Sequence, residues 1–149
     1  MNIEELLLLS ADRPPISIRP SATVRDAAML MASHCIGAVL VLDEHDALIG
    51  IVSERDLLTR VVALYRNLDT TLVSDIMTTD VRTARESDSA EYAVEMMSAG
   101  HFRHLPVIDA SGVVCGVVSI RDLLTEEVGA LSRRNADLLN FISADGPGG

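Results

Sequence analysis

The sequence predicts an α/β protein in which one strand–helix–strand–strand–helix unit occurs twice in tandem. A shift of 66 residues places residues 50–59 on residues 116–125 without a gap, and eight of the ten positions are identical. Self-similarity at such a period is typical of a duplicated supersecondary unit. Apolar runs that end in turn residues predict strands, and apolar residues spaced three and four apart predict the helices between them.

Both units present their elements in the same order. Thr23 is expected to cap the first helix of unit one, because Asp26 stands at the third helical position. Asp88 or Ser89 caps the matching helix of unit two. The predicted elements of the first unit are an extended segment at 16–18, a helix at 23–34, strands at 38–42 and 48–52, and a helix opened by Ser53. Those of the second unit are an extended segment at 81–84, a helix beginning near 90, strands at 105–108 and 113–118, and a helix opened by Ser119.

The linker between the units is polar, and a short helix at 73–77 leads into the second unit. The predicted domains are a first repeat with an N-terminal helix at 1–71, a second repeat at 72–130, and a C-terminal helix with a frayed tail at 131–149. The last helix is expected to continue towards Phe141, where it either contacts another subunit or covers the core.

The composition is that of a folded, acidic protein. Apolar residues make up 48% of the 149 positions and aromatic residues only 3%, so Val, Leu, Ile, Ala and Met must form the core. The net charge of −10 argues against a nucleic-acid surface and against an anionic membrane as a partner. Cys35 and Cys115 are isolated, which indicates buried thiols in a reducing compartment. The first 15 residues resemble neither a signal peptide nor a membrane span, so we expect a cytoplasmic protein.

Several motifs occur in a specific order. Both units contain Gly-apolar-apolar-Ser-x-Arg-Asp after a strand pair, and the chain also contains Asp-Ile-Met-Thr at 75–78 and His-Leu-Pro-Val-Ile-Asp at 104–109. With these motifs, residues 16–125 resemble a tandem cystathionine β-synthase (CBS) domain protein, or Bateman module. The resemblance implies two repeats packed with pseudo-twofold symmetry through their sheets, clefts between them for adenosine-containing ligands, and frequent dimerisation. Gly37 stands where the second copy has Arg103, so the two clefts are not equivalent.

The Ser-x-Arg-Asp segments are the strongest candidates for ligand binding. A helix N-terminus attracts anions, and Ser and Arg side chains can donate to phosphate oxygens. The resemblance implies that the Asp carboxylate accepts hydrogen bonds from two ribose hydroxyls. The same spacing is also a variant of the capping box, and this alternative stays open. The residues concerned are Ser53, Arg55 and Asp56 in the first unit and Ser119, Arg121 and Asp122 in the second.

Two other regions are candidates through the resemblance. It implies that Arg103 and His104 reach ligand phosphates, and the alternative for them is a solvated loop with a surface ion pair. It also implies that the extended segments Ser17–Ile18 and Thr83–Ala84 form a wall for adenine. The alternative for these segments is a plain sheet edge.

The function predicted from these motifs is regulatory. We expect a module that senses AMP, ADP, ATP or a related adenosine ligand in clefts between its repeats, needs no cofactor, forms a homodimer and signals to an effector protein. The alternative is a ligand-free dimerisation or protein-interaction scaffold. The four histidines lack metal-binding spacing, and neither a catalytic triad nor a Gly-rich phosphate loop is recognisable, so we expect no metal site and no enzyme activity.

Overall fold

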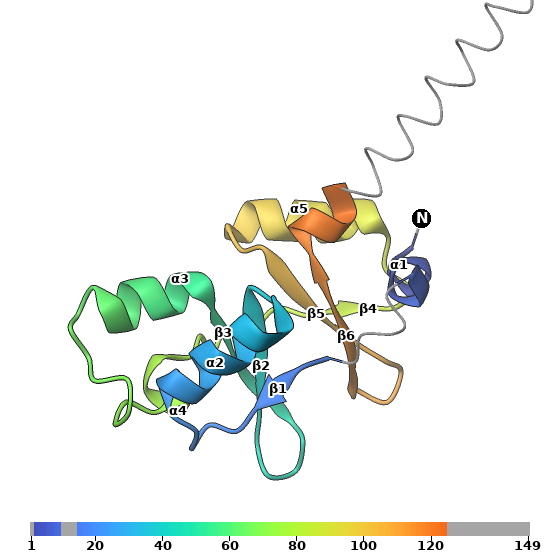
Figure 1. Cartoon of the computed structure of the whole chain (residues 1–149). Helices are drawn as coiled ribbons and strands as arrows, with labels where there is room; N and C mark the ends of the chain where they lie inside the picture. Colours follow the sequence, from blue (N-terminus) through green and yellow to red (C-terminus); the bar gives the residue numbers. More distant parts are fainter. Residues whose placement is uncertain (1, 10–14, 125–149) are drawn as a thin grey trace, which may run out of the picture.

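The computed structural model describes residues 2–9 and 15–124, and it contains the duplicated unit that the sequence predicts (Figure 1). The predicted helix towards Phe141 and the predicted tail lie outside the described residues. The first repeat consists of β1 (Ser17–Ile18), α2 (Val24–His34), β2 (Ala38–Leu42), β3 (Leu48–Ser53), α3 (Glu54–Leu57) and the π-helical turn η1 (Leu58–Val62). The second consists of β4 (Ala84–Arg85), α5 (Ala90–Gly100), β5 (His104–Ile108), β6 (Val114–Ser119) and a helical segment at 120–124.

Each repeat contains a three-stranded sheet with the same topology. In the first sheet β1 is parallel to β2 and β2 is antiparallel to β3, and β4, β5 and β6 repeat this arrangement. The registers also match, since Val41 pairs with Gly50 and Val107 pairs with Gly116. Both antiparallel pairs have an irregularity one residue later. The duplication is therefore structural as well as sequential.

The helix caps follow the sequence closely. Thr23 and Asp26 form the predicted capping box at the start of α2. Of the two candidates in the second repeat, Ser89 caps α5 by accepting from the amide of Tyr92, while the Asp88 carboxylate accepts from the amide of Arg85. A side-chain acceptor at each cap satisfies an amide that has no partner within the helix.

Three details differ from the sequence expectations. The extended segment expected at 81–84 pairs only at Ala84–Arg85, because Thr78 pairs with Ile51 of the first repeat and the chain then crosses to the second. The helix opened by Ser53 continues as a π-turn, in which the amide of Ala63 donates to the carbonyl of Leu58. Cys35 is exposed rather than buried, because it forms the left-handed C-cap of α2.

Two short helices each pack against the repeat that does not directly follow them in the sequence. Helix α1 (Ile3–Leu9) precedes the first repeat, yet its buried residues Ile3 and Leu6 belong to the core of the second. Helix α4 (Val73–Ile76) precedes the second repeat, yet Val73 and Ile76 belong to the core of the first. Each repeat is thus covered by the helix that leads into the other one.

Two glycines permit this close covering. A Cβ on Gly50 would lie 2.6 Å from Met77 Sδ, and a Cβ on Gly116 would lie 2.6 Å from Leu7 Cδ2. A larger residue would require the side chain of Met77 or of Leu7 to move, and at position 50 its Cβ would also lie 3.1 Å from the carbonyl oxygen of Thr78. The first position of the repeated Gly-apolar-apolar-Ser motif therefore has a packing role in both copies.

Candidate functional site

The two Ser-x-x-Asp segments form capping boxes at the point where a strand becomes a helix. At the start of α3 the amide of Asp56 donates to Ser53 Oγ at 3.2 Å, and the amide of Ser53 donates to Asp56 Oδ2 at 2.9 Å. The amide of Asp122 donates to Ser119 Oγ at 3.1 Å, and the amide of Ser119 donates to Asp122 Oδ2 at 3.2 Å. Both Ser-x-x-Asp segments therefore have the hydrogen bonds of a capping box. In each box the cap uses Oδ2 of the aspartate, so Oδ1 can accept from other partners.

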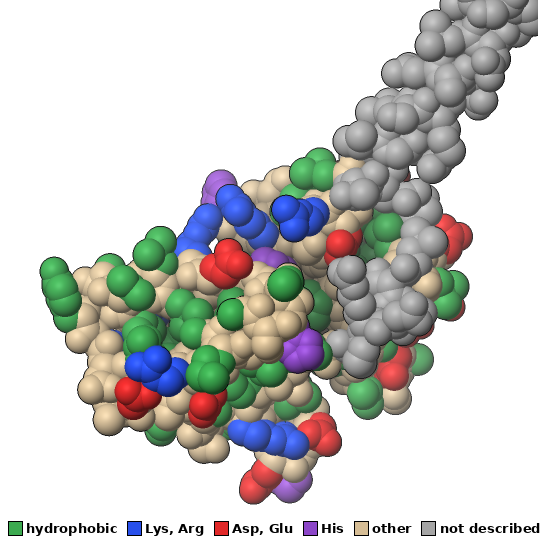
Figure 2. Space-filling model, in the orientation of Figure 1, with side chains coloured by type: hydrophobic (Ala, Val, Ile, Leu, Met, Phe, Trp, Pro, Cys, Tyr) green, Lys and Arg blue, Asp and Glu red, His purple; other side chains and the backbone are tan. Residues whose placement is uncertain are grey.

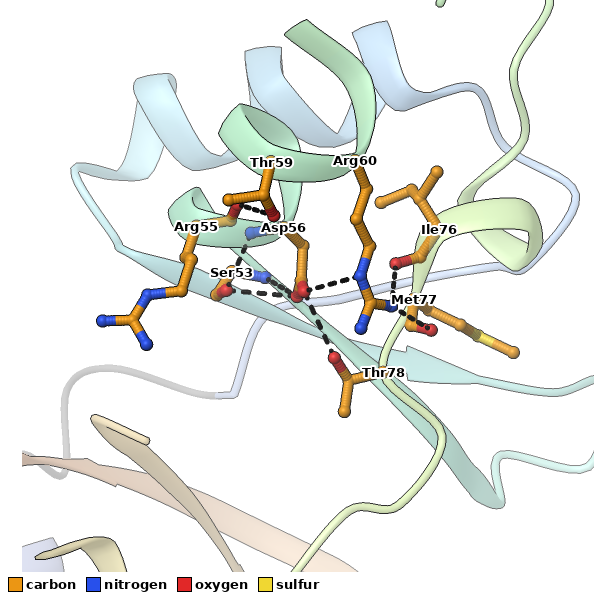
Figure 3. Close-up of polar contacts among 8 residues, drawn as sticks. All are labelled: Ser53, Arg55, Asp56, Thr59, Arg60, Ile76, Met77 and Thr78. Carbon is orange, nitrogen blue, oxygen red and sulfur yellow. Dashed lines mark hydrogen bonds and ion pairs between the residues drawn. The ribbon is translucent and has the colours of Figure 1, made fainter. Parts of the chain in front are cut away.

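The two aspartates have different surroundings. Asp56 is only 8% exposed, and its second oxygen, Oδ1, accepts from the Thr78 hydroxyl at 3.2 Å and lies 3.7 Å from Arg60 Nε (Figure 3). Asp122 is exposed, and among the described residues its hydrogen bonds are those of the cap. The first repeat therefore has the more elaborate site.

Sequence reasoning missed two members of this site. Thr78 belongs to the Asp-Ile-Met-Thr motif, but its contact with Asp56 joins residues 22 positions apart and leaves no local signal. Arg60 follows Asp56 by four positions, and this spacing places two side chains on the same face of a helix. The charge pattern alone could therefore have indicated Arg60.

Basic side chains gather where the start of α3 faces the loop after α5. Arg55 Nη1 donates to the carbonyl of His101 at 3.5 Å, so α3 of the first repeat contacts the second repeat. Arg103 lies exposed in the same loop. Figure 2 shows blue side chains over this junction, on a protein whose net charge is −10. The arginines can donate to anionic groups, and the carboxylates of Glu54 and Asp122 also lie near this junction, where they act on His104.

His104 lies at the contact between the repeats. Its imidazole lies 3.2 Å from the position that a Cβ on Gly37 would occupy. Burial lowers the pKa of His104 below the usual 6.5, although Glu54 and Asp122 act in the opposite direction; Arg103 lowers it further. The structure thus places His104 against the first repeat as a largely uncharged side chain at neutral pH.

This pKa shift predicts how stability changes with pH. Because the folded state holds the pKa of His104 below 6.5, the unfolded chain binds the proton more readily. The stabilising contribution is present above about pH 6.5 and is lost as the pH falls. Thermal unfolding between pH 7.5 and pH 5.5 should show a larger decrease in Tm for the wild type than for His104→Gln. His45→Gln, which removes an exposed imidazole, is the control; equal pH profiles for all three proteins would contradict the prediction.

The structure also places the remaining candidate residues. Ser17 and Ile18 form β1 and pair with Leu40 and Val41. Ala84 is 1% exposed and belongs to the core of the second repeat. Thr83 lines an open hollow of about 470 Å³ together with Arg82 and residues of α5. Arg121 is exposed beside Asp122.

Two further features of the described residues concern metal binding and thiol reactivity. No three His, Cys, Asp or Glu side chains among residues 2–9 and 15–124 could hold a metal ion together. Burial, followed by the nearby Glu86 carboxylate, raises the pKa of the Cys115 thiol to about 12, so this thiol stays protonated at neutral pH. Within those same ranges no helix is long and apolar enough to cross a membrane.

Two tandem α/β repeats, each covered by the helix that leads into the other and each with a Ser-x-x-Asp box at the start of a helix, define a duplicated α/β module. The model of the CBS domain matches residues 3–63 and 73–129. The chain therefore belongs to the CBS domain family.

Relatives and solved structures agree with this assignment. The chain is 37% identical over 117 residues to the uncharacterised protein MK0525 of Methanopyrus kandleri, which covers 78% of this chain and 60% of that protein. The chain thus spans about three fifths of the length of this relative. A protein with CBS domains from Burkholderia ambifaria superimposes with a TM-score of 0.82 at 34% identity, over 87% of this chain and 95% of that one. The CBS domain protein PAE2072 from Pyrobaculum aerophilum, in complex with AMP, gives a TM-score of 0.74 at 32% identity, over 82% and 89% of the two chains.

Proposed function

We propose that this protein is a non-catalytic regulatory module that binds an adenosine nucleotide at the junction of its repeats. The observation that carries the proposal is the group formed by Ser53, Asp56 and Thr78, with Arg55 and Arg103 nearby. It combines a fixed carboxylate with positively charged donors at a contact between the two repeats.

The chemistry of this group matches the two polar parts of a nucleotide. A carboxylate that is held by a cap accepts hydrogen bonds from vicinal ribose hydroxyls, and such charge-assisted bonds are about twice as strong as neutral ones. Arginine binds phosphate through a planar set of donors. The AMP bound to the Pyrobaculum relative supports an adenosine ligand of this kind. A ligand that contacts both repeats can favour one packing of them over another, which is the requirement for a sensor.

The second candidate function is a scaffold for self-association, and an apolar surface favours it. Leu58, Val62 and Tyr65 follow one another along η1 and the turn after it, and their exposed fractions are 61%, 61% and 96%. Leu124 occupies the position in the second repeat that matches Leu58, and it is 52% exposed. We propose that a second copy of the chain covers these side chains in a homodimer, with or without a nucleotide. The free thiols are compatible with the reducing cytoplasm, where we place the protein and its effector.

Thermal unfolding of nucleotide-stripped protein tests the proposal. The ligands to compare are AMP, ADP, ATP, S-adenosylmethionine, NAD and cyclic dinucleotides. A ligand at a hundred times its Kd should add about 2.7 kcal/mol to the free energy of unfolding, which is a shift of several degrees in a protein of this size. A selective shift supports the sensor, whereas no shift with any ligand rejects it in favour of the scaffold. Light scattering from the same stripped protein measures its molar mass and decides between monomer and dimer.

A further inference from the structure

Arg60 joins the candidate ligand site to the segment that links the two repeats. Its Nη1 donates to the carbonyl of Ile76 at 3.0 Å and to the carbonyl of Met77 at 3.3 Å, at the carboxyl end of α4. Its Nε faces Asp56 Oδ1 at 3.7 Å. Figure 3 shows the guanidinium between Asp56 and these two carbonyls. One planar group therefore contacts the carboxylate of the site and the end of the helix that precedes the second repeat.

The segment after α4 is attached to the first repeat at the same place. We call residues 77–83 the connector, since they run from α4 to β4. The amide of Thr78 donates to the carbonyl of Ile51 at 2.9 Å, the amide of Ile51 donates back at 3.0 Å, and the Thr78 hydroxyl donates to Asp56. The connector is thus held by the backbone of Ile51 and by the side chains of Asp56 and Arg60.

The second repeat lacks the same side chains in its sequence. The 66-residue shift places Glu126 at the position of Arg60 and Asp12 at the position of Thr78, and both lie outside the described residues. Acidic side chains at these positions cannot donate to the Asp122 carboxylate when ionised. Among residues 2–9 and 15–124, this arrangement of arginine, carboxylate and threonine belongs to the first repeat.

We infer that Arg60 is a positioning residue that couples the Asp56 site to the connector, so that a bound nucleotide and the fixed path of the connector stabilise each other. The nature of the ligand rests on the proposed function, whereas the role of Arg60 rests on its own contacts. Coupling is reciprocal: if a ligand bound at Asp56 favours the fixed connector, then loosening the connector lowers the affinity for the ligand by the same factor. Because the connector leads directly into β4, this is a physical route from the site to the packing of the second repeat.

The test combines hydrogen–deuterium exchange of the connector with measurement of the Kd for AMP. In the wild type, AMP should slow the exchange of the amides of Met77 and Thr78, which donate to the carbonyls of Val73 and Ile51. In Arg60→Gln the same amides should exchange about tenfold faster without ligand, AMP should no longer slow them, and the Kd should rise about 3–30-fold. Arg60→Lys keeps the charge near Asp56 but not the planar set of donors, so it should recover part of the affinity without restoring slow exchange.

The matched control is Arg25→Gln, which removes an exposed arginine–aspartate pair with Asp69 in the same repeat. It should leave both the exchange of the connector and the Kd unchanged. Equal connector exchange in Arg60→Gln and Arg25→Gln would overturn the inference, whatever the ligand. If AMP does not bind the wild type but Arg60→Gln still speeds connector exchange, the proposed function fails while the hold of Arg60 on the connector is supported.

Discussion

Asp56→Asn and Asp122→Asn, combined in one protein, are expected to weaken AMP binding by about 10–100-fold while the protein stays folded. A hydrogen bond to a charged group contributes about 1.5–3 kcal/mol, and the substitution replaces a carboxylate with a neutral amide at both candidate sites. The cost to stability should be about 1 kcal/mol for each cap, because the Ser hydroxyl still accepts from the first turn of the helix. Calorimetry measures the affinity, and urea unfolding measures the stability.

Asp26→Asn is the matched control for this experiment. Asp26 forms a capping box with Thr23 at the start of α2, and it occupies the same position in that box as Asp56 does in its own. It should reproduce the loss of cap stability without any change in AMP affinity. An AMP affinity that is unchanged in the double variant would contradict the ligand role of both aspartates and leave capping as their function.

Ile3→Ala should destabilise the protein by about 2–5 kcal/mol, although Ile3 lies close to the N-terminus. Its side chain is 0% exposed and belongs to the core of the second repeat. Truncation of a buried aliphatic side chain removes apolar burial and leaves a cavity that the surroundings fill only in part. The amide of Ile3 also donates to the carbonyl of Asp88 at 2.9 Å, so the backbone of α1 is held in the position where the cavity would form.

Leu8→Ala provides the comparison within the same helix. Leu8 is 70% exposed, so its truncation should change the free energy of unfolding by no more than about 0.5 kcal/mol. Urea unfolding of the three proteins measures the difference directly. Equal stability of Ile3→Ala and wild type would show that α1 does not contribute to the core in solution.

The repeated unit and its caps could be predicted because their signals are local. Thr23 with Asp26 and Ser53 with Asp56 are three positions apart, and a capping box needs no information beyond that spacing. The strands likewise follow from short apolar runs, and their observed bounds lie within a residue or two of the predicted ones in β2, β3, β5 and β6.

The arrangement of the site could not be predicted because its contacts are distant in sequence. Thr78 contacts Asp56 across 22 positions, and Arg55 contacts His101 across 46 positions. The motifs indicate which residue types are present, but the packing decides which of them meet. The unequal exposure of Asp56 and Asp122 depends on that packing in the same way.

The crossing of α1 and α4 has a consequence for how such a protein can be divided. The piece that repeats in the sequence is not the piece that folds, because each copy obtains its cover from a helix that belongs to the other copy's stretch of chain. If the chain were cut after residue 71, each fragment would expose the apolar surface that the missing helix covers. The first fragment would carry α1, which packs on the second repeat, and the second would carry α4, which packs on the first. When the two fragments are mixed, they should associate, because α1 of the first fragment covers the second repeat and α4 of the second fragment covers the first repeat.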